Sequence, residues 1–219
     1  MYKPIFTLDE LKKYLEGAAL AAFDFETAPL EKYRKEEKAA LDAHKSRIVG
    51  ISFSIAEGSG VYLPLAHRLD GSVADGDTDA GDANPAADVA GRDMNGNAKD
   101  QPAIWQWLEN WFTDPTVTKI AHNLAFESQF LYARGIVIQE PCYDTIAAAQ
   151  LVYKGEDGFR GLGDCGLKTL ASEWFEEHMP TYADVVGNRH FDELDPSAET
   201  TVRYACADAD YSLRIYHLV

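Results

Sequence analysis

The sequence predicts an α/β fold in which helices flank a mixed β-sheet, and two patterns carry this prediction. Three apolar runs of strand length follow one another at 18–25, 47–56 and 60–65. From residue 102 onward, segments with helical periodicity alternate with one more strand-like run at 116–122. A meander of three strands followed by helices and a further strand is typical of a sheet covered by helices.

The first element is a short helix over 7–17. Thr7 can cap it, because Glu10 stands three residues later and completes a capping box. Its apolar stripe consists of three leucines, Leu8, Leu11 and Leu15. The three strands follow, and a turn at 57–59 joins the second strand to the third.

The later elements are mainly helices. The segment 102–113 is expected to pack on the core through an apolar face made of Ile104, Trp107, Leu108 and Trp111. Further helices are expected at 125–135, 145–153, 167–177 and 197–218. Gly135 ends the first of these four, and a glycine-rich loop fills 155–166.

Residues 69–101 differ from the rest of the chain in composition. They include eight aspartates, two basic residues and almost no large apolar side chain. Such a segment buries too little apolar surface to offset the entropy of ordering it. We therefore expect a disordered acidic insertion within a single domain that spans 1–219. A calcium-binding loop is the alternative, although the twelve-residue pattern with its final glutamate is missing.

Charge and cysteine content limit the functional classes. The formal net charge of −16 disfavours tight binding of nucleic acid by this chain alone, so a nucleic-acid enzyme of this charge needs metal ions or a basic partner surface. The three cysteines show no zinc spacing and predict free thiols in a reducing cytosol. No run of 18 apolar residues and no secretory signal is present, which predicts a cytoplasmic protein without a membrane partner.

The first strand ends with Asp24 and Glu26. Alternate residues of a strand point to the same face, so the two carboxylates project together while Phe23 and Phe25 enter the core. The carboxylates lie ~7 Å apart along the strand, from a rise of ~3.3 Å per residue, and can share a divalent ion. Two solvated acids at a strand end are the alternative for this motif alone.

Two further acidic motifs follow in order. At a strand-to-helix junction, Asn123 and Glu127 lie four residues apart and share a face of the new helix. An Asn cap with an ordinary first-turn glutamate gives the same pattern. In the last helix, Tyr204 and Asp208 have the same spacing, which suits binding a metal ion and orienting a water molecule, and a merely exposed helix face is the alternative.

The order of these three motifs resembles the exonuclease motifs of the DEDD superfamily, in its tyrosine branch. The histidine branch has His five residues before the last Asp, where this chain has Arg203. Longer stretches, such as KIAHNLAFESQFLYARGI and CGLKTLASEWF, are similar to the 3′→5′ proofreading exonuclease domain of family A DNA polymerases. The resemblance covers nearly the whole chain outside the acidic insertion and implies an α/β, RNase H-like fold.

The resemblance also implies roles for individual residues. Four carboxylates would hold two Mg²⁺ or Mn²⁺ ions: Asp24, Glu26, Glu127 and Asp208. Tyr204 would hydrogen-bond the attacking water. The expected substrate-binding residues are Thr27, Leu30, His122, Asn123 and Phe126. The family usually has Asp where this chain has Glu127, which keeps the carboxylate but reaches farther by one methylene.

The activity that the resemblance implies is metal-dependent 3′→5′ hydrolysis at the end of single-stranded DNA, with release of nucleoside 5′-monophosphates. The implied partner is a DNA polymerase domain or subunit, in the cytoplasm of a bacterial or phage-infected cell. An RNase D-like RNA exonuclease is one alternative. A catalytically weakened structural or binding module is the other, favoured by Glu127 and by the net charge of −16.

Overall fold

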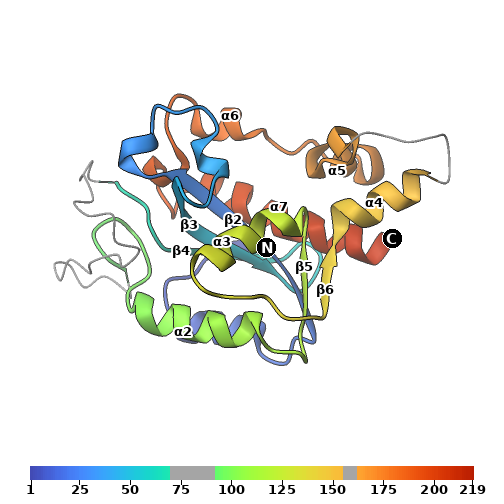
Figure 1. The fold of residues 1–219 in the computed structure, drawn as a ribbon, viewed down its shortest axis with the longest axis horizontal. Helices are drawn as coiled ribbons and strands as arrows, with labels where there is room; N and C mark the ends of the chain where they lie inside the picture. Colours follow the sequence, from blue (N-terminus) through green and yellow to red (C-terminus); the bar gives the residue numbers. More distant parts are fainter. Residues whose placement is uncertain (70–91, 155–161) are drawn as a thin grey trace.

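The computed structural model describes residues 1–69, 92–154 and 162–219. Within these ranges the chain forms one six-stranded sheet in the order β1-β4-β3-β2-β5-β6 (Figure 1). The strands are β1 (Tyr2–Pro4), β2 (Leu20–Pro29), β3 (Ser46–Ser54), β4 (Gly60–Pro64), β5 (Thr118–Ala121) and β6 (Cys142–Asp144). The β2–β3 and β3–β4 pairs are antiparallel and the other pairs are parallel. The predicted mixed sheet and its three-stranded meander are confirmed.

Helices lie on both faces of this sheet. They are α1 (Leu8–Leu15), α2 (Gln101–Phe112), α3 (Leu124–Ala133), α4 (Thr145–Lys154), α5 (Leu167–Phe175), α6 (Tyr182–Val186) and α7 (Glu199–Leu218). Short 3₁₀ turns complete the chain: η1 (Glu31–Tyr33), η2 (Ala39–Leu41), η3 (Leu162–Cys165) and η4 (Phe191–Glu193). The capping box predicted for the first helix is present, because the Thr7 hydroxyl accepts from the Glu10 amide.

The core has one layer on each side of the sheet. On one face, Phe23 and Phe53 of the strands pack with Leu108 of α2 and Phe130 of α3. On the other face, α7 contacts strands β1 to β5 (Figure 1). Apolar burial on both sides of a mixed sheet explains why its strands read as continuous apolar runs in the sequence.

Gly50 allows an unusually close contact on the α7 side. It stands opposite Glu26 in the β2–β3 ladder and opposite Pro64 in the β3–β4 ladder. A Cβ at this position would overlap the ring and hydroxyl of Tyr62, which is fully buried. Glycine therefore lets Tyr62 lie against β3 next to an acidic residue of β2.

The structure differs from the sequence-based expectations in its short elements, which include α6 and the two edge strands, and in the acidic insertion. Strands β1 and β6 were not predicted, because each has three residues and lies at an edge of the sheet. The expected disorder also does not extend to 92–100. There, Arg92 and Ala98 form an antiparallel bridge, and the Asn97 side chain bonds both backbone groups of His67.

Those hydrogen bonds order a segment that has little apolar surface to bury. Residues 70–91 of the predicted insertion, and 155–161 of the predicted glycine-rich loop, lie outside the described residues. Among the described residues, no helix combines the length and the apolar character that crossing a membrane requires.

Candidate active site

Strand β2 supplies two acidic side chains to the face covered by α7. Ala22 of this strand shares an apolar cluster with Leu213 of α7. Asp24 and Glu26 follow at alternate positions and therefore point to the same side. The pairing register with β3 shifts directly after Glu26, and such an irregularity locally re-aims the strand. The two carboxylates predicted to project together do so toward α7.

Helix α7 brings the third acidic side chain to the same place. Tyr204 and Asp208 lie one helical turn apart. One carboxylate oxygen each from Asp24, Glu26 and Asp208 lies within 4.8 Å of the others. The first and third sequence motifs, which are separated by almost the whole chain, thus converge on one point.

Glu127 enters from α3. This helix begins after β5, and Asn123 stands at its N-cap with a left-handed backbone angle (φ 73°). The backbone amides of Asn123 and Leu124 donate to the Asp144 carboxylate, which fixes the start of α3. Glu127 is 1% exposed. Burial raises its pKa, and the charges of Asp24, Asp144 and Asp208 raise it further, because Glu127 lies near these acids. Glu127 is not one of the three residues of the oxygen cluster.

The four acids share one electrostatic pattern. Burial raises the pKa of all four, namely Asp24, Glu26, Glu127 and Asp208. The neighbouring carboxylates raise the pKa of Asp24, Glu26 and Glu127 further, by repulsion between like charges. The pKa of Asp208 rises to about 6, and the charge of Lys168 limits that rise. Ionising such a group of buried acids costs free energy unless cations lie nearby.

The donor atoms fit divalent metal ions. Three buried carboxylate oxygens, Glu26 Oε1, Glu127 Oε2 and Asp208 Oδ1, have no hydrogen-bond partner among the described residues. A buried unpartnered oxygen loses its hydration without compensation. Hard cations such as Mg²⁺ and Mn²⁺ bind sets of oxygen ligands of this kind. The acidic cluster is therefore chemically suited to hold such an ion.

Two residues beside the acids were missed by the sequence analysis. Lys168 of α5 lies with its Nζ 3.1 Å from the Tyr204 hydroxyl and 3.8 Å from Asp208 Oδ2. Tyr182, at the start of α6, is close enough to Glu26 that the carboxylate charge adds to burial in raising its pKa. A single lysine or tyrosine at a helix start gives no motif, so only the packing of α5 and α6 against α7 reveals them.

The residues expected to bind substrate differ in their partners and in their exposure. The Thr27 hydroxyl donates to the Ala40 carbonyl at 2.7 Å. His122 is hydrogen-bonded to Thr145, and burial lowers its pKa to about 4, so it is turned toward the start of α4. Leu30 and Phe126 are partly exposed, and Asn123 is exposed.

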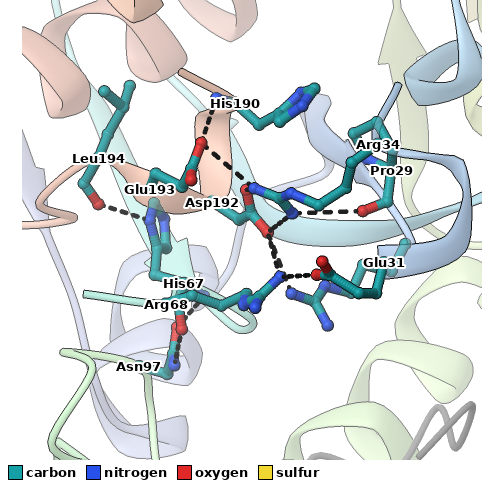
Figure 2. A network of polar contacts seen from close by, with 11 residues as sticks. Pro29, Glu31, Arg34, His67, Arg68, Asn97, His190, Asp192, Glu193 and Leu194 are labelled. Atoms are coloured by element: carbon teal, nitrogen blue, oxygen red, sulfur yellow. Dashed lines mark hydrogen bonds and ion pairs between the residues drawn. The ribbon is translucent and has the colours of Figure 1, made fainter. Parts of the chain in front are cut away.

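A buried ion-pair network fastens the loops next to the site (Figure 2). Asp192 of η4 is fully buried and accepts from Arg34 at 2.8 and 3.0 Å and from Arg47 at 3.1 Å. Arg68 lies 4.0 Å from the same carboxylate and pairs with Glu31 at 2.8 Å. The loop after β2 is thereby tied to the segment before α7, and both flank elements that carry the acids.

Comparison with known proteins places the chain in a family. A family model described as 3′-5′ exonuclease matches residues 1–218. The chain belongs to the 3′-5′ exonuclease family. Curated relatives of this exonuclease include DNA polymerase I of Treponema pallidum, which is 28% identical over 99% of this chain, and DNA polymerase I of Chloroflexus aurantiacus, which is 27% identical over 95%. The predicted resemblance to family A DNA polymerases is confirmed.

The curated relatives are longer than this chain, and a solved structure shares its fold. The exonuclease chain spans 21% and 18% of these two relatives, respectively. The crystal structure of Escherichia coli RNase D covers the whole chain with a TM-score of 0.60 at 17% identity, and the match takes in 44% of that structure. This similarity confirms the RNase H-like fold class that the sequence predicted.

Proposed function

We propose that this 3′-5′ exonuclease removes nucleotides from the 3′ end of single-stranded DNA with two Mg²⁺ or Mn²⁺ ions and releases nucleoside 5′-monophosphates. The observation that supports the proposal best is the convergence of Asp24, Glu26 and Asp208 within 4.8 Å, beside Glu127 and the Tyr204 hydroxyl. The three unpartnered buried oxygens of these acids then become metal ligands.

Ions bound there would supply a nucleophilic water at neutral pH and stabilise the charge on the leaving 3′-oxygen. The carboxylates of β2, α3 and α7 would hold them. Tyr204 acts on the water itself. Burial, together with the charges of Glu26, Asp208 and Asp24, raises the pKa of Tyr204 far above neutrality. Its hydroxyl therefore keeps its proton, and it orients the attacking water by a hydrogen bond.

The substrate residues are proposed from the predicted motifs. Leu30, Asn123 and Phe126 have partly or fully exposed side chains and would contact the terminal nucleotide. Thr27 and His122 bond to Ala40 and Thr145, and they would shape the pocket from behind. A single-stranded end is expected, because a duplex has to fray before its last nucleotide reaches a small pocket.

We further propose that the chain acts as one proofreading domain attached to a polymerase in the bacterial cytoplasm. Its relatives are bacterial DNA polymerase I proteins about five times longer, and a polymerase part would provide the basic surface that a chain of net charge −16 lacks. An RNA exonuclease is the second candidate, because the fold is similar to that of RNase D.

Degradation of 5′-labelled oligonucleotides tests the proposal. Single-stranded DNA and RNA of one sequence are incubated with Mg²⁺ or Mn²⁺, with and without a chelator. A shortening ladder on DNA is expected from the wild type and from Asp195→Ala, which removes an exposed acid outside the site. No ladder is expected from the Asp24→Ala, Asp208→Ala double variant. A ladder on RNA alone would favour the RNase D-like function, and no ladder from folded wild type would favour a non-catalytic module.

A further inference from the structure

Lys168 is the only basic side chain that the described residues place against the acidic cluster. Its Nζ lies 3.1 Å from the Tyr204 hydroxyl oxygen, 3.8 Å from Asp208 Oδ2 and 4.3 Å from the centroid of the Tyr204 ring. The side chain is 31% exposed. Three contacts from one ammonium group to two neighbouring side chains of α7 fix its position much more closely than a single surface ion pair does.

The chemistry of the two groups sets the direction of the hydrogen bond. A lysine ammonium has three N–H donors and no acceptor, whereas a phenol oxygen can both donate and accept. In the 3.1 Å contact, Lys168 therefore donates and the Tyr204 oxygen accepts. The phenol proton consequently points away from Lys168, because the side of the oxygen that faces the ammonium is occupied.

The other charged groups around the Tyr204 phenol are acidic. The carboxylates of Glu26, Asp208 and Asp24 act on its phenol, and Tyr204 is only 6% exposed. The carboxylates are therefore the charged groups that can attract a phenol proton turned away from Lys168, and metal ions and the attacking water would be held there.

We propose that Lys168 is a positioning residue, which donates to the Tyr204 oxygen and so aims the phenol proton at the attacking water. This inference rests on the proposed exonuclease function and adds a residue to it. Lys168 does not touch the reacting atoms in this role, and it acts through Tyr204. A role limited to neutralising the acids would depend only on the positive charge of Lys168 and would not need its hydrogen bond to Tyr204.

Kinetics of Lys168→Met and Tyr204→Phe, singly and together, separate the two roles. We expect Lys168→Met to lower kcat about 10- to 100-fold, because it leaves the phenol proton free to turn, while KM for single-stranded DNA changes less than about 3-fold. In the Tyr204→Phe background, Lys168→Met should cause no further loss of kcat. In the wild-type background, Lys168→Arg should keep part of the kcat that Lys168→Met loses. Independent losses that multiply in the double variant would overturn the proposal.

Arg203→Met is the matched control. Arg203 precedes Tyr204 on α7 but is 63% exposed and pairs with Glu177 at 3.6 Å. The control removes one positive charge and should leave kcat within about 2-fold of the wild type, as for other exposed ion pairs. A loss equal to that of Lys168→Met would show a general charge effect and overturn the proposal.

Two readouts do not depend on turnover. In metal-free protein carrying tyrosine isotope-labelled at Cζ, the NMR signal that disappears in Tyr204→Phe should shift in Lys168→Met and stay unchanged in Arg203→Met. An unshifted signal would refute the hydrogen bond. Calorimetric Mn²⁺ binding should become about 3- to 10-fold tighter in Lys168→Met, because a positive charge near Asp208 is removed; weaker binding would instead show that Lys168 only holds the acids in place.

A wild type that cleaves no DNA would refute the proposed function, and the NMR signal would still decide whether the hydrogen bond exists. A wild type that cleaves DNA, with Lys168→Met equally active, would refute the positioning role alone.

Discussion

Replacing Asp192 by alanine tests whether the buried ion-pair network holds the loops beside the acidic site. Asp192 is fully buried and accepts two hydrogen bonds from Arg34 and one from Arg47. The replacement leaves both guanidinium groups in a poorly hydrated place without their shared carboxylate.

The expected loss of stability follows from the exposure of the partners. Removing one member of a buried ion pair costs about 3 to 5 kcal/mol. The side chains of Arg34 and Arg47 are 13% and 20% exposed, and Arg34 keeps Glu193 at 3.2 Å. We therefore expect the lower value, about 3 kcal/mol. For a chain of 219 residues, this corresponds to a fall in Tm of about 6 to 12 °C.

Urea and thermal unfolding of the variant, followed by circular dichroism at neutral pH, measure this loss. Asp195→Ala is the control, because Asp195 is an exposed acid three residues away whose carboxylate, among the described residues, accepts only from the Ser197 amide. We expect the control to lose less than about 1 kcal/mol. If Asp192→Ala and Asp195→Ala were equally stable, the network would not hold the two loops together and the reasoning would be refuted.

Three further predictions concern other parts of the molecule. Burial lowers the pKa of His67 to about 4 from an ordinary 6.5, so the unfolded chain takes up this proton first as the pH falls. The stability that neutral His67 contributes should therefore be complete well above pH 6.5 and fall by about 2 to 3 kcal/mol toward pH 4.5. Urea unfolding at both pH values should show that this part of the pH dependence is missing in His67→Gln. Glu127→Gln should lower kcat at least about 10-fold and weaken Mn²⁺ binding, yet raise the Tm of the metal-free protein by removing a buried charge; an unchanged rate would exclude Glu127 from the site. Gly50→Ala should destabilise the protein by about 1 to 3 kcal/mol in urea unfolding, because the new Cβ overlaps Tyr62, and a neutral effect would mean that the ring moves freely.

The sequence predicted the elements whose signal is local. The alternation around Asp24 and Glu26, the spacing of Tyr204 and Asp208, and the capping box at Thr7 each lie within a few residues, and the structure contains the strand, the last helix and the cap that they indicated. The order of the motifs predicted the family, which the match over 1–218 confirms.

Features that depend on distant partners were not predictable in this way. Asp192 is 158 residues from Arg34, and nothing near either residue indicates the other. Asn97 orders the end of the acidic insertion through His67, 30 residues earlier. Lys168 lies 36 residues before Tyr204 and is an ordinary helical lysine until α5 packs on α7. Hydrogen bonds and ion pairs of this kind leave no periodic pattern in the sequence.

The separation of the acids along the chain has a consequence for biosynthesis. Asp24 lies on the second strand and Asp208 on the last described helix, and α7 contacts strands β1 to β5 and also β6, where Tyr216 packs on Tyr143. Contacts between residues so far apart form slowly, because a long loop must close first. A nascent chain on the ribosome therefore cannot assemble the acidic cluster until α7 has emerged.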